Sequence, residues 1–436
     1  MGNLFLVDPN GQKYTYEWLA TEIENYIQKF RIPGAELPEG AVVCVCAEYN
    51  PYFIALMRAL MQLKAIIVLV LTIEASRKPV SFIEAEFSVT IKGSTVFVDR
   101  IGARSKNLMY ETLRKKNHAG LVLLTSGSGG SPKGIVHDFD QIWLSHQEKK
   151  KNPYRTIPVM KLDHIGGLNT LLSCLNSQGV LYIPSSLNPF ILGRMIEKYQ
   201  IQLLPATPSF LRQILMASRQ QTFNLQSLEC ITYGAEPASQ NLLFELKNVL
   251  PKVFLKQTYG LSETGILSTQ SLSSESLYFQ ILQNSTHQTR IVNGELQIKS
   301  KNMMLGYLNA AQPFTDDGWL QTKDQVQESD IGLRVMGRKS DMINIGGNKV
   351  YPIEIESIIS EIDFVEDVTV SKAEHLIFGE IIQAQVVLRN KKVARELKIK
   401  IKKHCALQME KFKIPVSIQF VDQVQLTTRL KKDRQL

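Results

Sequence analysis

A loop of hydroxyl groups and glycines that ends in a lysine is the clearest chemical signal in this chain. It runs from Thr125 to Gly134 and follows the apolar run Leu121 to Leu124, which predicts a buried strand. Glycines let backbone N–H groups approach phosphate oxygens, and Lys133 adds a positive charge. Pro132 precedes the lysine, so this is not the common Gly-x-x-x-x-Gly-Lys-Ser/Thr loop. We expect a phosphate-binding loop, with a surface linker as the alternative. Its expected contact residues are Thr125, Ser126, Gly127, Ser128, Gly130 and Lys133.

Further motifs follow this loop along the chain. They are Tyr233 to Pro237, Tyr259 to Glu263, Gly318 to Asp324, Gly337 to Asp341 and Thr427 to Arg434. Together with the Pro-Lys-Gly of the loop, these segments resemble the motifs of the adenylate-forming superfamily, which includes acyl-CoA synthetases, stand-alone adenylation domains and luciferases. The resemblance begins at Thr125, and the part of the chain before it carries no motif of its own.

The resemblance implies a reaction in two halves. A carboxylate attacks the α-phosphate of ATP, which releases pyrophosphate and leaves an acyl-adenylate, and a thiol then attacks this anhydride. Because an anion meets a polyanion, cations and hydrogen-bond donors must neutralise the developing charge. We expect an ATP-dependent acid–CoA ligase that uses Mg²⁺, of the type found in fatty acid metabolism. One alternative loads the phosphopantetheine of an acyl carrier protein. The other is a nucleotide-binding interaction protein without catalysis.

The nucleotide and metal ligands follow from the matched motifs. Glu263 is the expected Mg²⁺ ligand, since magnesium prefers hard oxygen donors beside phosphates. Asp324 is similar to the residue that accepts hydrogen bonds from ribose hydroxyls, and Arg338 to the one that reaches ribose or phosphate. Tyr259 is expected to stack on the adenine ring, and Gly234, Ala235 and Glu236 to form a backbone wall on its other side. Gly260 and Ser262, from the same motif as Tyr259, complete the expected nucleotide contacts, with Ser262 as a further donor.

Lys431 is the expected catalytic lysine, with Lys133 acting beside it on the phosphates. A flexible ammonium can bridge the acid and the α-phosphate during adenylation. Only the register with Thr427 and Arg434 distinguishes Lys431 from the other lysines of a basic tail, and Lys432 is the one most easily mistaken for it.

A histidine marks the expected acid site. His164, in the stretch Asp163 to Leu168, is similar to the family's His-x-x-Gly-Leu segment, which lines the acyl pocket. Relatives that activate α-amino acids use an aspartate at this place, so we expect an acid without an α-ammonium group. A histidine that only fills the core is the alternative. The segment Gly337 to Asp341 resembles the hinge motif of the family, which continues through Gly346 and Gly347. The resemblance implies that these two glycines admit the thiol, since a side chain there would block its approach.

Some positions depart from the family pattern without removing a group that bears the chemistry. Lys323 and Leu430 replace family glycines before the ribose aspartate and the catalytic lysine. Gly129 replaces a threonine of the phosphate loop, and Ser340 stands where the family has an Asp or Lys at its hinge.

The elements that position these residues are expected to form two domains, since 436 residues exceed one hydrophobic core. Up to about Leu250, short apolar strands alternate with amphipathic helices such as 15–30 and 188–199. This alternation predicts an α/β fold, with parallel-rich sheets flanked by helices. A small antiparallel or barrel-like segment follows at 294–336. We expect an N-terminal adenylation domain over 1–336 and a small, mobile α+β lid over 337–436.

Composition limits the partners and the compartment. The net charge is +9, and from Arg389 to Leu436 we count 14 Lys and Arg against 4 Asp and Glu. Few aromatic residues interleave there, so a coenzyme A or carrier-protein surface is favoured over nucleic acid; a solvated helix face is the alternative. We expect no membrane span and a cytoplasmic location, because no uninterrupted apolar run is long enough. The 5 cysteines lack zinc spacing and are expected to be free thiols.

Overall fold

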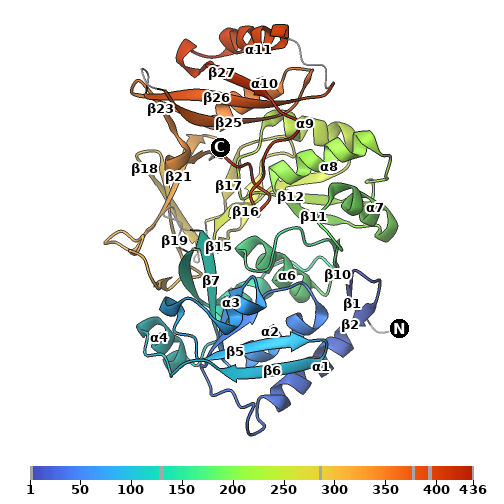
Figure 1. Cartoon of the computed structure of the whole chain (residues 1–436), viewed down its shortest axis with the longest axis vertical. Coiled ribbons are helices and arrows are strands. Elements are labelled where there is room, and N and C mark those ends of the chain that lie inside the picture. Colours follow the sequence, from blue (N-terminus) through green and yellow to red (C-terminus); the bar gives the residue numbers. More distant parts are fainter. Residues whose placement is uncertain (1–2, 127–131, 284–286, 376–378, 391–394, 435–436) are drawn as a thin grey trace.

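The computed structural model describes residues 3–126, 132–283, 287–375, 379–390 and 395–434. Figure 1 shows a larger N-terminal part built on three sheets, with a small unit from the C-terminal end of the chain stacked on it. The expected α/β class is confirmed. The boundary at residue 337 stays a prediction, although the chain enters the small unit soon after this point.

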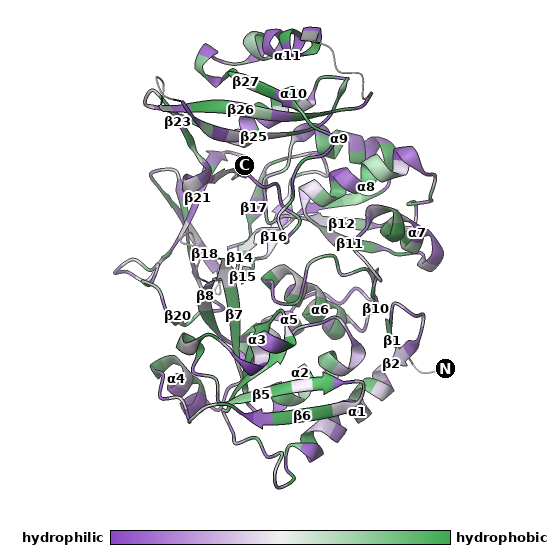
Figure 2. Ribbon diagram, in the orientation of Figure 1, coloured by the Kyte–Doolittle hydropathy of each residue, from purple (hydrophilic) through white to green (hydrophobic). Residues whose placement is uncertain are grey.

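The first sheet is a mixed, seven-stranded sheet at the base of the molecule. Its four inner strands run parallel, and three antiparallel strands complete its edges. In order across the sheet the strands are β20 (Gly306–Tyr307), β8 (Pro132–Asp138), β7 (Gly120–Ser126), β4 (Ile66–Val70), β3 (Val42–Cys46), β5 (Phe87–Lys92) and β6 (Thr95–Arg100). Figure 2 shows β7 mostly in the hydrophobic colour, as expected for a strand covered on both faces.

The helices of this half begin where the sequence supplies caps. Thr15 accepts a hydrogen bond from the Trp18 N–H, and Asn50 accepts one from the Phe53 N–H, which fixes where the first two long helices start. The expected helix 15–30 is confirmed as α1. The helices are α1 (Tyr16–Lys29), α2 (Pro51–Gln62), α3 (Ile73–Arg77), the short 3₁₀ turn Ser81–Ile83, α4 (Leu108–Lys116) and α5 (Phe139–Gln147).

The second sheet also has seven strands, and all its pairs except the last are parallel. Its strands are β13 (Phe254–Gln257), β12 (Cys230–Tyr233), β11 (Leu203–Ala206), β9 (Arg155–Thr156), β10 (Val180–Tyr182), β1 (Leu4–Val7) and β2 (Lys13–Thr15). The associated helices are α6 (Ile165–Ser177), α7 (Pro189–Tyr199), α8 (Pro208–Gln220) and α9 (Gln240–Val249).

The third sheet is antiparallel throughout, which confirms the change of pattern expected in this region. It begins earlier in the chain than 294, because strands before that residue join it. Its strands are β16 (Thr269–Ser271), β17 (Phe279–Ile281), β22 (Gly332–Arg338), β21 (Leu320–Ser329), β19 (Glu295–Ser300) and β18 (His287–Val292), with the separate hairpin β14 (Gly260–Leu261) and β15 (Gly265–Ile266) beside it.

The C-terminal unit, called the lid below, has its own sheet and core. A buried apolar cluster that includes Val368, Ile382 and Ile401 joins its sheet to its helices. Its elements are the 3₁₀ turn Lys339–Asp341, the hairpin β23 (Ile343–Ile345) and β24 (Asn348–Val350), α10 (Pro352–Ser360), β25 (Val365–His375), β26 (Gly379–Leu388), α11 (Arg395–Gln408), the 3₁₀ turn Lys411–Lys413 and β27 (Ser417–Phe420). The expected α+β composition is confirmed.

Charged side chains join the lid to the larger part. Glu245 of α9 lies 2.5 Å from Arg212, 2.8 Å from Arg219 and 2.9 Å from Arg389 of the lid. Arg219 also forms an ion pair with Glu366 of β25. Ion pairs therefore form part of the contact between the two parts.

Among the described residues, no helix has the length and apolar character needed to cross a membrane. The cysteines are free thiols, of which Cys44, Cys174 and Cys405 are buried.

Candidate active site

The last described residues form a tight turn between the lid and the larger part of the molecule. We call residues 425–434 the C-terminal loop. Leu426 pairs with Lys432 in an antiparallel bridge, and the Thr427 N–H donates to the Lys431 carbonyl over 2.8 Å. This hairpin geometry makes successive side chains leave the loop in different directions.

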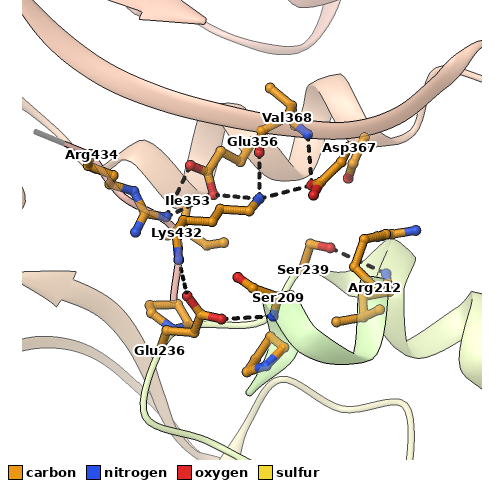
Figure 3. A pocket seen from close by; sticks show the side chains of 14 residues that line it. Ser209, Arg212, Glu236, Ser239, Ile353, Glu356, Asp367, Val368, Lys432 and Arg434 are labelled. Atoms are coloured by element: carbon orange, nitrogen blue, oxygen red, sulfur yellow. Dashed lines mark hydrogen bonds and ion pairs between the residues drawn. The ribbon is translucent and has the colours of Figure 1, made fainter. Parts of the chain in front are cut away.

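Lys432 and Arg434 hold the C-terminal loop on the lid. The Lys432 ammonium lies 3.2 Å from Asp367 and 3.5 Å from Glu356, and Arg434 lies 2.9 Å from Glu356 (Figure 3). Although burial opposes its ionisation, the two cations hold the pKa of Glu356 below its usual value. The Lys432 ammonium is therefore paired with carboxylates of the lid and is not free to act on a substrate.

Lys431 belongs to a different environment. Burial lowers the pKa of its ammonium, as do Arg338 and Arg429, while Glu236 and Asp324 act in the opposite direction. The C-terminal loop thus brings a lysine of the lid to charged residues of the larger part. The structure separates the two lysines that the motif alone distinguished only by register.

Asp324, Tyr259 and Arg338 form one connected group. The Tyr259 hydroxyl donates to Asp324 over 2.6 Å, and Arg338 Nε lies 3.3 Å from the other carboxylate oxygen. Burial raises the pKa of Asp324, an effect that Arg338 opposes. The Tyr259 ring stacks on Phe279 with centroids 6.0 Å apart. Each carboxylate oxygen keeps a further lone pair, so Asp324 can still accept from ribose hydroxyls.

Glu263 is held by a tyrosine that carries no sequence motif. The Tyr307 hydroxyl donates to Glu263 Oε1 over 2.6 Å, and the Lys133 ammonium lies 5.1 Å from the centroid of the Tyr307 ring. Tyr307 thus links the expected metal ligand to the expected phosphate-binding lysine. A carboxylate with one oxygen oriented by a hydroxyl fits the oxygen ligands that Mg²⁺ prefers.

The segment before Glu263 is also supported from beneath. His137 of β8 is fully buried, and its Nε2–H donates to the Ser262 carbonyl over 2.6 Å. Burial lowers the pKa of His137, so the ring is neutral. This bond fixes the backbone of Ser262 next to the expected metal ligand.

The phosphate loop connects two antiparallel strands. Thr125 lies opposite Lys133 in the β7–β8 ladder, and Ser126 lies opposite Pro132. Gly127, Ser128 and Gly130, also expected to contact phosphates, lie outside the described residues.

His164 begins helix α6. Its Nδ1 accepts a hydrogen bond from the Gly166 N–H over 3.1 Å, which is a helix-capping role. Burial, with Lys431 and Arg429 nearby, lowers the pKa of His164 to about 3. The ring is therefore neutral and carries its proton on Nε2, where it can act as a donor. Asp163 beside it is buried, and burial raises its pKa.

The expected adenine wall depends on close backbone packing. A Cβ atom on Gly234 would lie 2.4 Å from the Thr258 carbonyl oxygen, and one on Gly260 would lie 2.3 Å from that of Gly265. Neither position accepts a side chain without a shift of backbone. Ala235 follows with φ of +70°, which turns the chain toward Glu236.

Gly347 belongs to a separate turn of the lid. It forms the β23–β24 turn with Gly346 at φ of +91°, a value that favours glycine. Within the described ranges, no hydrogen bond or ion pair joins this turn to Asp324 or Lys431.

Sequence reasoning missed Tyr307, His137, Arg429 and Thr207. Arg429 donates to the carbonyl of Leu124 over 3.3 Å, at the strand end that enters the phosphate loop. It lies two residues before Lys431, within the recognised motif, so its position was a usable signal. The others had none.

Comparisons with known proteins identify the family of the chain. The family model described as "AMP-binding enzyme" matches residues 2–308, and the model of its C-terminal domain matches residues 354–432. A 2-succinylbenzoate–CoA ligase of Bacillus pumilus is 26% identical over 456 aligned residues, which cover 95% of this chain and 90% of that protein.

Solved structures share the fold at lower identity. The anthranilate CoA ligase AuaEII, in complex with anthranoyl-AMP, has a TM-score of 0.80 at 17% identity and covers 98% of this chain and 92% of its own. The o-succinylbenzoate CoA synthetase of Bacillus subtilis, with its acyl-adenylate intermediate, has a TM-score of 0.71 at 20% identity over 99% and 94%.

Proposed function

The chain belongs to the AMP-binding enzyme family, and on that premise we propose that it is an ATP-dependent acid–CoA ligase. The observation that supports the proposal is that Lys431 of the C-terminal loop is partly buried and interacts electrostatically with groups of the larger part. These groups are Asp324, Arg338 and His164, which come from separate elements of the larger part.

The first half-reaction joins the acid to the nucleotide. A carboxylate oxygen of the acid attacks the α-phosphorus of ATP, the bond from that phosphorus to the bridging oxygen breaks, and pyrophosphate leaves. The Lys431 ammonium bridges the two anions as they approach, and the neutral His164 donates from Nε2 at the acid. Asp324 and Tyr259 orient the ribose.

Mg²⁺, when bound, neutralises charge on the phosphates. Glu263 would hold it, with Tyr307 fixing the orientation of the carboxylate. Lys133 adds a further positive charge at the end of the phosphate loop.

The second half-reaction transfers the acyl group. A thiolate attacks the acyl carbon, the anhydride bond breaks, and AMP leaves. We propose coenzyme A as the acceptor, because the relatives described above are CoA ligases. In the described residues Gly346 and Gly347 make no hydrogen bond with Asp324 or Lys431, so we propose that they reach the thiol when the lid turns about the segment near residue 337. A carrier-protein thiol is the alternative, for which the basic surface of α11 is the supporting observation.

We propose an aryl-substituted carboxylic acid as the substrate class. The relatives named above act on 2-succinylbenzoate and anthranilate, and they lend no support to the expectation of fatty acid metabolism.

The test is pyrophosphate release from ATP and Mg²⁺ across a panel of aryl, fatty and hydroxy acids, with and without coenzyme A. Acid-dependent release that disappears in Lys431→Ala, with a thioester formed only when coenzyme A is added, is the expected result. Release without any thioester, in the presence of coenzyme A, would point to a carrier-protein acceptor. Measurable ATP binding with no release from any acid would overturn the proposal.

A further inference from the structure

We infer that Glu236 and Thr207 are positioning residues, which dock the C-terminal loop on the larger part of the molecule and thereby aim Lys431. The inference rests on the proposed function for its effect on catalysis, but the docking contacts are independent of it.

Glu236 uses both carboxylate oxygens on backbone N–H groups. One oxygen accepts from Ser209 at the start of α8 over 2.8 Å, and the other accepts from Lys432 over 3.1 Å (Figure 3). The first bond fixes the carboxylate relative to helix α8. The second then fixes the peptide group that follows Lys431.

Thr207 holds the other side of the same lysine. Its hydroxyl donates to the Leu430 carbonyl over 2.5 Å and accepts from the Phe210 N–H over 3.2 Å. The same hydroxyl therefore binds the C-terminal loop and caps helix α8. Thr207 and Glu236 therefore bind the backbone on both sides of Lys431, at the Leu430 carbonyl and the Lys432 N–H.

Leu430 adds an apolar contact to these hydrogen bonds. Its side chain packs against the buried cluster that contains Phe210 and Leu204. Its φ of +56° is unusual for a leucine, and the surrounding contacts hold it there. This explains how a leucine stands where the family has glycine.

The two sets of contacts have different fates when the lid moves. Lys432 and Arg434 hold the C-terminal loop to the lid through side chains, and these pairs travel with it. The bonds to Glu236 and Thr207 reach the larger part and must break. Docking should therefore serve adenylation, in which Lys431 acts, and not the transfer to coenzyme A.

Hydrogen exchange tests the docking without any need for activity. Thr207→Val and Glu236→Gln should each raise the exchange rate of amides in residues 425–434 about 10-fold or more. Thr207→Ser keeps the hydroxyl and should exchange like the parent. Ser239→Ala is the matched control, since the Ser239 hydroxyl accepts from the Leu242 N–H at the start of the neighbouring helix α9 and makes no hydrogen bond to the described residues 425–434. Equal exchange in Thr207→Val and the parent would overturn the inference.

The half-reactions then test the catalytic consequence. In Thr207→Val, kcat for pyrophosphate release should fall about 10-fold with little change in the KM for ATP, while thioester formation from a synthetic acyl-adenylate and coenzyme A keeps the parental rate. An equal loss in both half-reactions would indicate general misfolding and would contradict a positioning role. If the parent itself releases no pyrophosphate, the proposed function fails, and the exchange experiment alone decides the docking.

Discussion

Lys431 and Lys432 are adjacent in sequence, yet their ammonium groups belong to different parts of the molecule. That of Lys432 lies 3.2 Å from Asp367 in the lid sheet, whereas the opposite charges acting on Lys431 are those of Glu236 and Asp324 in the larger part. One lysine holds the C-terminal loop, and the other is presented by it.

Replacing each lysine by alanine should therefore give different losses. Lys431→Ala should lower kcat for pyrophosphate release by about 10²–10³-fold, since a positioned charge is removed, and should leave the unfolding midpoint unchanged. Lys432→Ala leaves Glu356 and Asp367 buried with one cation fewer, so the free energy of unfolding should fall by about 3 kcal/mol. Urea unfolding and single-turnover kinetics measure the two effects, and the reverse pattern would show that the assignment is wrong.

Glu263→Gln should raise the Mg²⁺ concentration needed for half-maximal pyrophosphate release. The amide keeps the shape but loses the negative charge that the metal requires. Tyr307→Phe removes only the hydroxyl that orients the carboxylate, so we expect a change in the same direction of about 10-fold. A magnesium titration of each variant provides the comparison. Unchanged metal dependence in both would exclude Glu263 as the ligand.

The alkaline side of the pH–rate profile should report Lys431. Burial lowers the pKa of its ammonium below the ordinary value of 10.5, so the group loses its proton as the pH rises, earlier than a free lysine does. Pyrophosphate release should fall over the same range. Lys431→Arg stays charged, and its residual activity should lack this fall. His164, with its pKa near 3, should add no inflection between about pH 5 and 8. A fall that persists in Lys431→Arg would assign it to another group.

Lys323→Gly should stabilise the protein. Lys323 is exposed and has φ of +61°, in the left-handed region that costs a side chain energy. The gain in the free energy of unfolding should be about 1 kcal/mol or less, because glycine also gives the unfolded chain more freedom. Lys301→Gly, at an exposed turn outside that region, is the control and should not stabilise. Chemical denaturation of the two variants separates backbone relief from loss of charge.

Much of the fold follows from local patterns in the sequence. The caps and apolar spacing around Thr15 and Asn50 place helices within a residue or two, and the alternation of strand and helix gives the parallel sheets. Pairings between distant segments leave no such mark. Strand β1 lies beside β10 through Leu6 and Leu181, and no local pattern connects these two segments.

The site divides in the same way. The motifs name Asp324, Arg338 and Lys431, which the structure brings together, but they do not name the residues that orient them. Tyr307 lies 44 positions after Glu263 with no pattern around it. Single hydrogen bonds from unpatterned positions can be found only once the chain is folded.

The ion pair between α9 and the lid makes the rate of turnover sensitive to ionic strength. In the proposed cycle, the turn of the lid parts Arg389 from Glu245 and later restores the pair. Counterions screen such charges, most strongly where they face water. Rising ionic strength should therefore favour the released lid, slowing the step that needs it docked and hastening the one that follows. The steady-state amount of enzyme-bound acyl-adenylate should then be higher at low ionic strength than at high ionic strength.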